Sequence, residues 1–155
     1  MSVDPGMAGR VYPPSPPYQV GREKIREFAT ATRAGHAAHH DVAAARALGY
    51  PDLVAPPTFA VILAQRTEAQ VVHDPASGID FSRVVHGEEK FLHHRPIVAG
   101  DSLVGVLHIE SVRARAGITM VVTRVEIEDE AGAPVSTVTS MLVIRAADPS
   151  LDGGA

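Results

Sequence analysis

A long apolar stretch, Thr58 to Val72, stands before four segments rich in β-branched residues, and this order constrains the fold most. Two prolines end the sequence Val-Ala-Pro-Pro at residues 54–57. Prolines suit the first turn of a helix and disfavour a helix before them. Phe59, Ile62 and Leu63 share one helical face, and alanines and valines leave little polar surface beside them. The pattern predicts a helix buried on most sides.

The second half of the chain has the pattern of a β-sheet. Val121, Thr123, Val125 and Ile127 alternate with charged residues, which is typical of a strand with one buried face. Short polar turns separate the segments. The strands are predicted at residues 83–94, 102–111, 118–128 and 135–145, with a short edge strand at 18–20.

Two further helices are predicted in the first half of the chain, at residues 22–32 and 41–48. Asp41 is a plausible N-cap for the second, and Gly49 a plausible stop. Helices first and an antiparallel meander afterwards favour an α+β fold over alternating α/β. We therefore expect the sheet to wrap around the long helix.

The length of 155 residues suits one domain. The sequence shows no internal repeat. Residues 11–17 carry four prolines and are expected to be an extended lead-in. We expect a flexible N-terminus at 1–10, one domain at 11–147 and a flexible tail at 148–155.

Composition excludes several function classes. There is no cysteine, so a disulfide framework, a thiolate zinc site and a cysteine nucleophile are excluded. The net charge of −4 argues against binding nucleic acid through bulk charge. No apolar run approaches the ~20 residues of a membrane span. Met1 to Gly9 lacks the pattern of a signal peptide, so the expected location is cytoplasmic.

Three segments resemble the MaoC-like dehydratase and hydratase family. They are GREKIREFATAT at 21–32, HHDVAAARALGYPDLVAPPTF at 39–59 and VVHGEEKFLHHRPIVAGDSL at 84–103. With the closing strands, the resemblance covers nearly the whole chain, and it implies a single hot-dog fold. Within the family the chain is most similar to short actinobacterial subunits of type II fatty-acid synthesis. Among these it resembles most the substrate-binding subunit of a heterodimeric (3R)-3-hydroxyacyl-carrier-protein dehydratase.

The resemblance implies an Asp-x-Asn-Pro-x-His stretch before the short helix, whose Asp and His manage water and a proton. Here Ala34 stands at the Asp position, His36 at the Asn position and Ala37 at the Pro position, while His39 stands at the catalytic His position. His39 is therefore the candidate catalytic residue. A solvated or capping histidine is the alternative. Asp41 lies on the other side of His39 in sequence and does not replace the missing acid.

A second position departs from the family pattern. Catalytic relatives resemble each other in Ala-His-Gly before the central helix, where the glycine N–H holds the thioester carbonyl. Here the triplet is Ala55-Pro56-Pro57, and proline has no N–H. Thr58 is the next residue able to supply one. Both departures predict that this chain is poor at the chemistry by itself.

The remaining candidates each have a plainer alternative. Phe59 and Ile62 are acyl-channel candidates or simply core residues, and His86 is a channel candidate or a structural strand residue. An acidic carrier protein would be attracted by basic side chains near the first long strand, which otherwise are solvated: Arg83, Lys90 and Arg95. His36, His39 and His40 are a weak metal signal. The predicted substrate-binding residues are Pro57, Thr58, Phe59, Ile62 and His86.

The resemblance implies a subunit of a (3R)-3-hydroxyacyl thioester dehydratase or enoyl thioester hydratase, acting on a carrier-protein or coenzyme A thioester without a cofactor. The expected assembly is a homodimer, or a heterodimer with a second hot-dog subunit that carries the Asp and His. One rival is a non-catalytic acyl-thioester binding subunit. The other is a hot-dog thioesterase, for which Glu68 is the candidate carboxylate.

Overall fold

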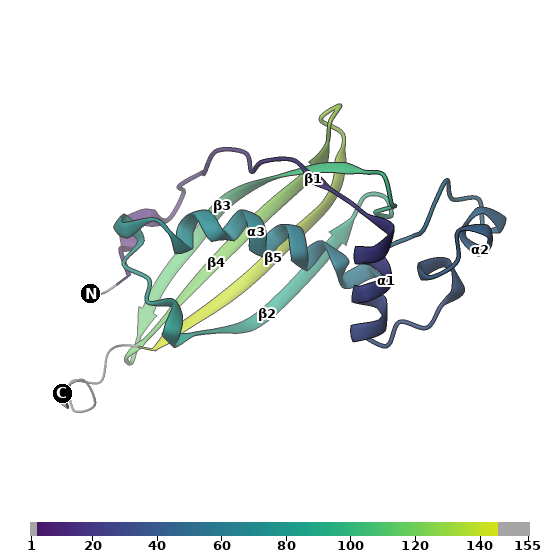
Figure 1. The fold of residues 1–155 in the computed structure, drawn as a ribbon. Helices are drawn as coiled ribbons and strands as arrows, with labels where there is room; N and C mark the ends of the chain where they lie inside the picture. Colours follow the sequence, from purple (N-terminus) through teal and green to yellow (C-terminus); the bar gives the residue numbers. More distant parts are fainter. Residues whose placement is uncertain (1–2, 146–155) are drawn as a thin grey trace.

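The computed structural model describes residues 3–145 as an antiparallel sheet with one long helix on its inner face (Figure 1). The α-helices are α1 (Arg22–Ala31), α2 (Val42–Ala47) and α3 (Ala60–Val72). The strands are β1 (Tyr18–Gln19), β2 (Val84–His93), β3 (Ser102–Arg115), β4 (Ile118–Asp129) and β5 (Pro134–Arg145). The 3-10 turns are η1 (Pro5–Met7), η2 (Ala37–His39), η3 (Pro57–Phe59), η4 (Pro75–Ser77) and η5 (Phe81–Arg83).

The sheet has the strand order β1-β3-β4-β5-β2, and every pairing is antiparallel. The sheet curls around α3, while α1 and α2 lie at the end where α3 begins (Figure 1). This arrangement is the α+β hot-dog fold, so the predicted fold class is confirmed. None of the helices within residues 3–145 is long and apolar enough to cross a membrane.

The core lies between α3 and the inner face of β3, β4 and β5. Leu107, Val125 and Val138 lie in one row across these strands and are fully buried, since Leu107 pairs with Val125 and Val125 with Val138. From α3, Leu63 and Val71 pack onto this face. The period of two predicted for these strands therefore gives the observed buried face.

The element boundaries agree with the sequence patterns to within a few residues. The prolines at 56 and 57 do start the long helix, but its first turn is the 3-10 turn η3. Asp41 caps α2 as predicted, and its carboxylate accepts hydrogen bonds from the N–H groups of Ala43 and Ala44. Strand β3 runs four residues beyond the predicted end, because its last residues pair with the start of β4.

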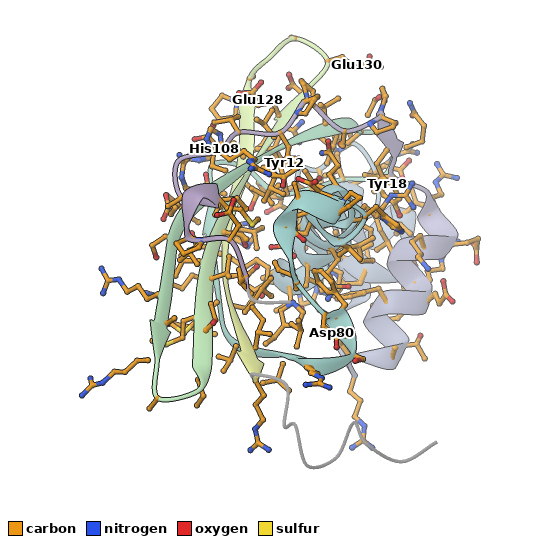
Figure 2. All side chains as sticks on the ribbon, turned by 90° about the vertical axis from the view of Figure 1, so that its left-hand side faces the viewer. Tyr12, Tyr18, Asp80, His108, Glu128 and Glu130 are labelled. Atoms are coloured by element: carbon orange, nitrogen blue, oxygen red, sulfur yellow. The ribbon has the colours of Figure 1, made fainter. Side chains whose placement is uncertain are left out.

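The N-terminal segment packs on the sheet. Met7 is fully buried, and the Gly9 N–H donates to the Ile109 carbonyl at 2.7 Å. The Tyr12 hydroxyl donates to Asp74 at 2.8 Å, and Tyr12 lies near His108 over β3 (Figure 2). For residues 3–10 the structure therefore replaces the expected flexible terminus with a packed segment. The tail expected from residue 148 lies outside the described residues.

Strand β2 forms one edge of the sheet and pairs only with β5 within the described chain. Its register shifts between His86 and Glu88, so Gly87 marks a bulge. Val85 and Leu92 are 63% and 61% exposed. A ten-residue edge with exposed apolar side chains is an available surface for pairing with another strand.

Candidate functional site

A pocket of about 520 Å³ lies beside the start of the central helix. Three segments build its walls: the loop with η2, the residues that lead into η3, and the turn after β2. Residues from all three line it: His36, His39, Val54, Ala55, Pro56, Pro57, His93, His94, Arg95, Pro96 and Ile97. The candidate catalytic residue His39 and the candidate binding residue Pro57 thus meet in one cavity.

Backbone hydrogen bonds fix the loop that carries the first two histidines. The His36 side chain caps η2, with the Ala38 N–H donating to its Nδ1 atom at 3.2 Å. His39 Nδ1 lies 2.6 Å from the Val54 carbonyl oxygen, which ties η2 to the segment before α3. The Val54 N–H in turn donates to the Ala38 carbonyl. Two hydrogen bonds, both to Val54, therefore tie η2 to the segment before α3.

A second pair of backbone hydrogen bonds joins the segment before α3 to the turn after β2. The Ala55 N–H donates to the Ile97 carbonyl at 2.8 Å, and the Ala99 N–H donates to the Leu53 carbonyl at 2.9 Å. Leu53 is fully buried and Ala55 nearly so. Two segments about forty residues apart in the chain thus form a short bridged ladder that shapes the pocket.

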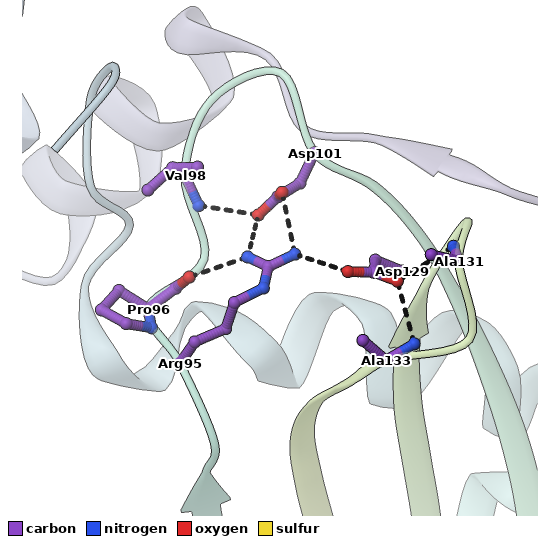
Figure 3. Close-up of polar contacts among 7 residues, drawn as sticks. All are labelled: Arg95, Pro96, Val98, Asp101, Asp129, Ala131 and Ala133. Atoms are coloured by element: carbon purple, nitrogen blue, oxygen red, sulfur yellow. Dashed lines mark hydrogen bonds and ion pairs between the residues drawn. The ribbon is translucent and has the colours of Figure 1, made fainter.

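Arg95 holds the turn after β2 in place through its polar contacts (Figure 3). Its guanidinium donates to both carboxylate oxygens of Asp101, at 2.8 and 3.0 Å, and to the Pro96 carbonyl at 3.0 Å. Asp129 at the β4–β5 turn is 3.5 Å away. Asp101 also accepts from the Val98 N–H at 2.9 Å. The hydrogen bonds to Asp101 raise the pKa of Arg95, so this cation is fixed in the wall.

The turn at Gly100-Asp101 therefore has a second role that the sequence did not suggest. Its glycine takes a positive φ of 97°, as a tight turn before a strand requires. Asp101, however, is also the main partner of Arg95. The other two basic candidates for carrier attraction have acidic neighbours as well: Arg83 lies 3.1 Å from Asp80, and Lys90 lies 3.1 Å from Glu88.

The other predicted binding residues lie outside the lining of this pocket. Thr58 is exposed at the start of the helix, and Ile62 is half-buried. Phe59 is fully buried, with its ring 5.4 Å from that of Phe28 in an edge-on arrangement. His86 is exposed near the beginning of β2. Phe59 is thus a core residue, the plainer of its two alternatives.

Glu68, the candidate carboxylate of a thioesterase, lies elsewhere in the fold. It is 5% exposed beneath the second half of α3, and it accepts a hydrogen bond from the Thr123 hydroxyl at 2.6 Å. Burial raises its pKa, although the bond from Thr123 opposes this. Glu68 does not line the pocket. A carboxylate packed under the helix is poorly placed to activate water at a thioester beside Pro57.

Sequence reasoning missed one wall of the pocket. His93 and His94 were not among the predicted site residues, and Arg95 was expected to be solvated or to attract a carrier protein, yet all three line the cavity together with His36 and His39. The signal available was the histidine content: four of the eight histidines line this one pocket. The lining contains no carboxylate. Within residues 3–145 no three His, Asp or Glu side chains are grouped to hold a metal ion.

The fold and the pocket define a hot-dog protein of the dehydratase and hydratase class. A family model described as the FAS1-like dehydratase domain region matches residues 7–138. The chain belongs to this family. It is 52% identical over 151 residues to a UPF0336 protein of Saccharopolyspora erythraea, a match that covers 96% of this chain and 97% of the relative.

Two solved structures agree with this assignment. One is the C-terminally truncated HadBC (3R-hydroxyacyl-ACP dehydratase) complex from Mycobacterium tuberculosis; a chain of it is 35% identical, with a TM-score of 0.78, over 88% of this chain and 96% of that one. The other is a MaoC-like dehydratase, 37% identical with a TM-score of 0.83, over 92% of this chain and 43% of that longer one. The predicted MaoC-like family is therefore confirmed.

Proposed function

We propose that this chain is the acyl-binding subunit of a heterodimeric (3R)-3-hydroxyacyl thioester dehydratase or enoyl thioester hydratase. The observation that carries the proposal is the composition of the pocket. It holds an imidazole at the catalytic histidine position, but Ala34 stands where the family has its acid, and Pro57 stands where the family has its carbonyl-holding N–H. A partner subunit with an intact Asp and His supplies what is missing.

The chemistry explains why these two positions matter. Adding water to an enoyl thioester requires a base for the water proton and a donor for the enolate oxygen that develops at the carbonyl. Loss of one such donor typically lowers the rate by about 10²–10³. A homodimer carries the same substitutions in both copies, so it does not repair them. A heterodimer does.

The free edge at β2 supports the assembly. The backbone groups of its ten residues that do not bond to β5 face outward, and Val85 and Leu92 offer apolar contact. Pairing two such edges would make one continuous sheet and cover the exposed strand. The HadBC complex that the chain resembles contains two kinds of subunit by its name. We infer that this chain pairs through β2 with a second hot-dog subunit.

The test compares hydration of a short enoyl thioester by the chain alone and by the chain co-purified with a hot-dog partner that carries the Asp and His. We expect very slow turnover alone and a gain of at least about 10²-fold in the complex. His39→Ala is measured in both settings, with His73→Ala as a matched control at the exposed end of α3. Rapid turnover by the lone chain that His39→Ala abolishes would overturn the division of labour. Release of free acid instead of hydrated product would favour the thioesterase.

A further inference from the structure

Hydrogen bonds to the backbone fix the protons of two pocket histidines in opposite ways. A carbonyl oxygen only accepts, so the Val54 carbonyl requires a proton on Nδ1 of His39. A backbone N–H only donates, so the Ala38 N–H requires a lone pair on Nδ1 of His36. A neutral imidazole carries one N–H. His36 is therefore protonated at Nε2, whereas Nε2 of His39 carries a lone pair.

The other cationic or imidazole groups of the pocket are placed differently. His93 and His94 contact the hydroxyls of Ser136 and Thr137, at 3.0 and 3.4 Å. A hydroxyl both donates and accepts, so these contacts do not select a tautomer. The guanidinium of Arg95 is already bound to Asp101, Asp129 and the Pro96 carbonyl. Of the four histidines that line the pocket, His36 is the one whose backbone hydrogen bond at Nδ1 leaves the N–H on Nε2.

His36 and His39 are also close neighbours. Their ring centroids lie 5.9 Å apart with the planes at 63°, and both line the pocket beside Pro56 and Pro57. These prolines provide no N–H at the start of the helix. The cavity thus places a fixed donor and a fixed acceptor side by side, next to the position from which the family's backbone donor is missing.

We propose that the His36 Nε2–H donates a hydrogen bond to the thioester carbonyl oxygen and takes over the role of the N–H that Pro57 lacks. The proposal rests on the proposed function and assigns the donor within it. A neutral imidazole is a competent electrophile for a carbonyl group. Its N–H needs no proton transfer to do this, because the donor stabilises charge that develops on the oxygen.

The complete step balances without an acid from this chain. The base, supplied by the Asp and His of the partner subunit, takes a proton from water while the water oxygen bonds to C3. The C2–C3 π electrons move toward the carbonyl, where His36 holds the enolate oxygen. The protonated base then returns the proton to C2. Water has added across the double bond, the base regains its starting protonation, and His36 has kept its N–H throughout.

The direct test measures carbonyl polarisation instead of turnover. The probe is the coenzyme A thioester of 2,4-hexadienoic acid, whose absorption moves to longer wavelength when its carbonyl accepts a strong hydrogen bond. Binding is measured in a His39→Ala background, which suppresses hydration of the probe. We expect a red shift that His36→Ala removes and His36→Gln largely retains, because glutamine keeps an N–H donor. The matched control is His73→Gln at the exposed end of α3, outside the pocket lining, which should leave the shift unchanged.

A rescue variant sharpens the test. Pro57→Ala installs a backbone N–H at the position where the family has its donor. In the His36→Ala chain we expect Pro57→Ala to restore the red shift, because both donors serve the same oxygen. Circular dichroism establishes that each variant is folded. A shift that survives His36→Ala, or that His36→Gln loses as completely as His36→Ala does, overturns the assignment.

Turnover gives the second readout and separates the two proposals. In the complex with a catalytic partner, His36→Ala should lower kcat by about 10²-fold with little change in KM, as expected for a contact that strengthens in the transition state. If the partner confers no activity but the red shift depends on His36, the subunit-division proposal fails and the donor assignment stands. If the partner confers activity and neither kcat nor the shift depends on His36, only the donor assignment fails.

Discussion

Thr67 of α3 lies so close to Gly105 of β3 that a Cβ atom at residue 105 would be 2.2 Å from the Thr67 hydroxyl oxygen. Thr67 is 1% exposed, and its hydroxyl donates to the Leu63 carbonyl at 2.8 Å. The side chain is therefore held in place over the sheet. This contact sets how closely the central helix approaches the inner face of β3.

Gly105→Ala should destabilise the protein by about 1–3 kcal/mol, because the added methyl group forces the helix away from the sheet or Thr67 out of its rotamer. The measurement is urea unfolding at equilibrium. Gly35→Ala is the control, since a Cβ at residue 35 has no heavy atom within 4 Å and the backbone there needs no positive φ. Thr67→Ala in the Gly105→Ala background should recover part of the loss; equal stability of Gly105→Ala and Gly35→Ala would contradict the steric account.

Arg95→Lys should destabilise the protein nearly as much as Arg95→Ala, by about 1 kcal/mol, although lysine keeps the charge. Only the planar guanidinium pairs with both oxygens of Asp101 and also reaches Asp129. The side chain is 34% exposed, which limits the effect. Thermal unfolding measures it. Lys24→Ala, which removes an exposed i,i+3 pair with Glu27, should change stability by at most a few tenths of a kcal/mol.

Glu68→Gln should stabilise the protein at neutral pH, and the gain should shrink as the pH falls. Burial raises the pKa of Glu68, so the folded protein holds its proton more tightly than the unfolded chain. The stability contributed by the protonated carboxyl is complete below about 4.5, its ordinary pKa, and is lost as pH rises through the higher folded pKa. Glutamine keeps an acceptor for Thr123 and has no charge to bury.

Two neighbouring groups interact with the Glu68 carboxyl. Burial also raises the pKa of Glu89, which interacts with Glu68, and His86 acts on both carboxyls. The measurement is the free energy of unfolding between pH 4.5 and 8 for wild type and variant. Glu130→Gln, at the exposed β4–β5 turn (Figure 2), serves as the control. A Glu68→Gln gain that does not increase with pH would exclude burial of this carboxyl as its cause.

Leu92→Lys should weaken self-association or partner association by at least about tenfold. Leu92 is 61% exposed on the β2 edge, and a lysine on an edge strand disfavours pairing with another strand. Sedimentation of the chain, alone and with its partner, measures the effect. Ile118→Lys is the control, because Ile118 is 41% exposed at the start of β4, away from this edge. If Ile118→Lys disrupts the assembly and Leu92→Lys does not, the interface lies elsewhere.

The sequence by itself determined the elements of this fold. The two prolines before the central helix, the Asp41 cap and the period of two in the strands act through local sterics and hydrogen bonds, so they are visible within short windows. The resemblance to the MaoC-like family, read from equally short stretches, located the departures at Ala34 and Pro57. Strand ends were less well defined, because the last four residues of β3 depend on pairing with β4 and not on their own pattern.

Only the tertiary structure decided what the pocket contains. Met7 is buried against a sheet about a hundred residues away in the chain, and Arg95 is held by Asp101 and Asp129 from two different turns. The opposite tautomers of His36 and His39 follow from an amide two residues on and a carbonyl fifteen residues on. Such contacts form between segments that the folded chain brings together, and neither composition nor periodicity encodes which groups will meet.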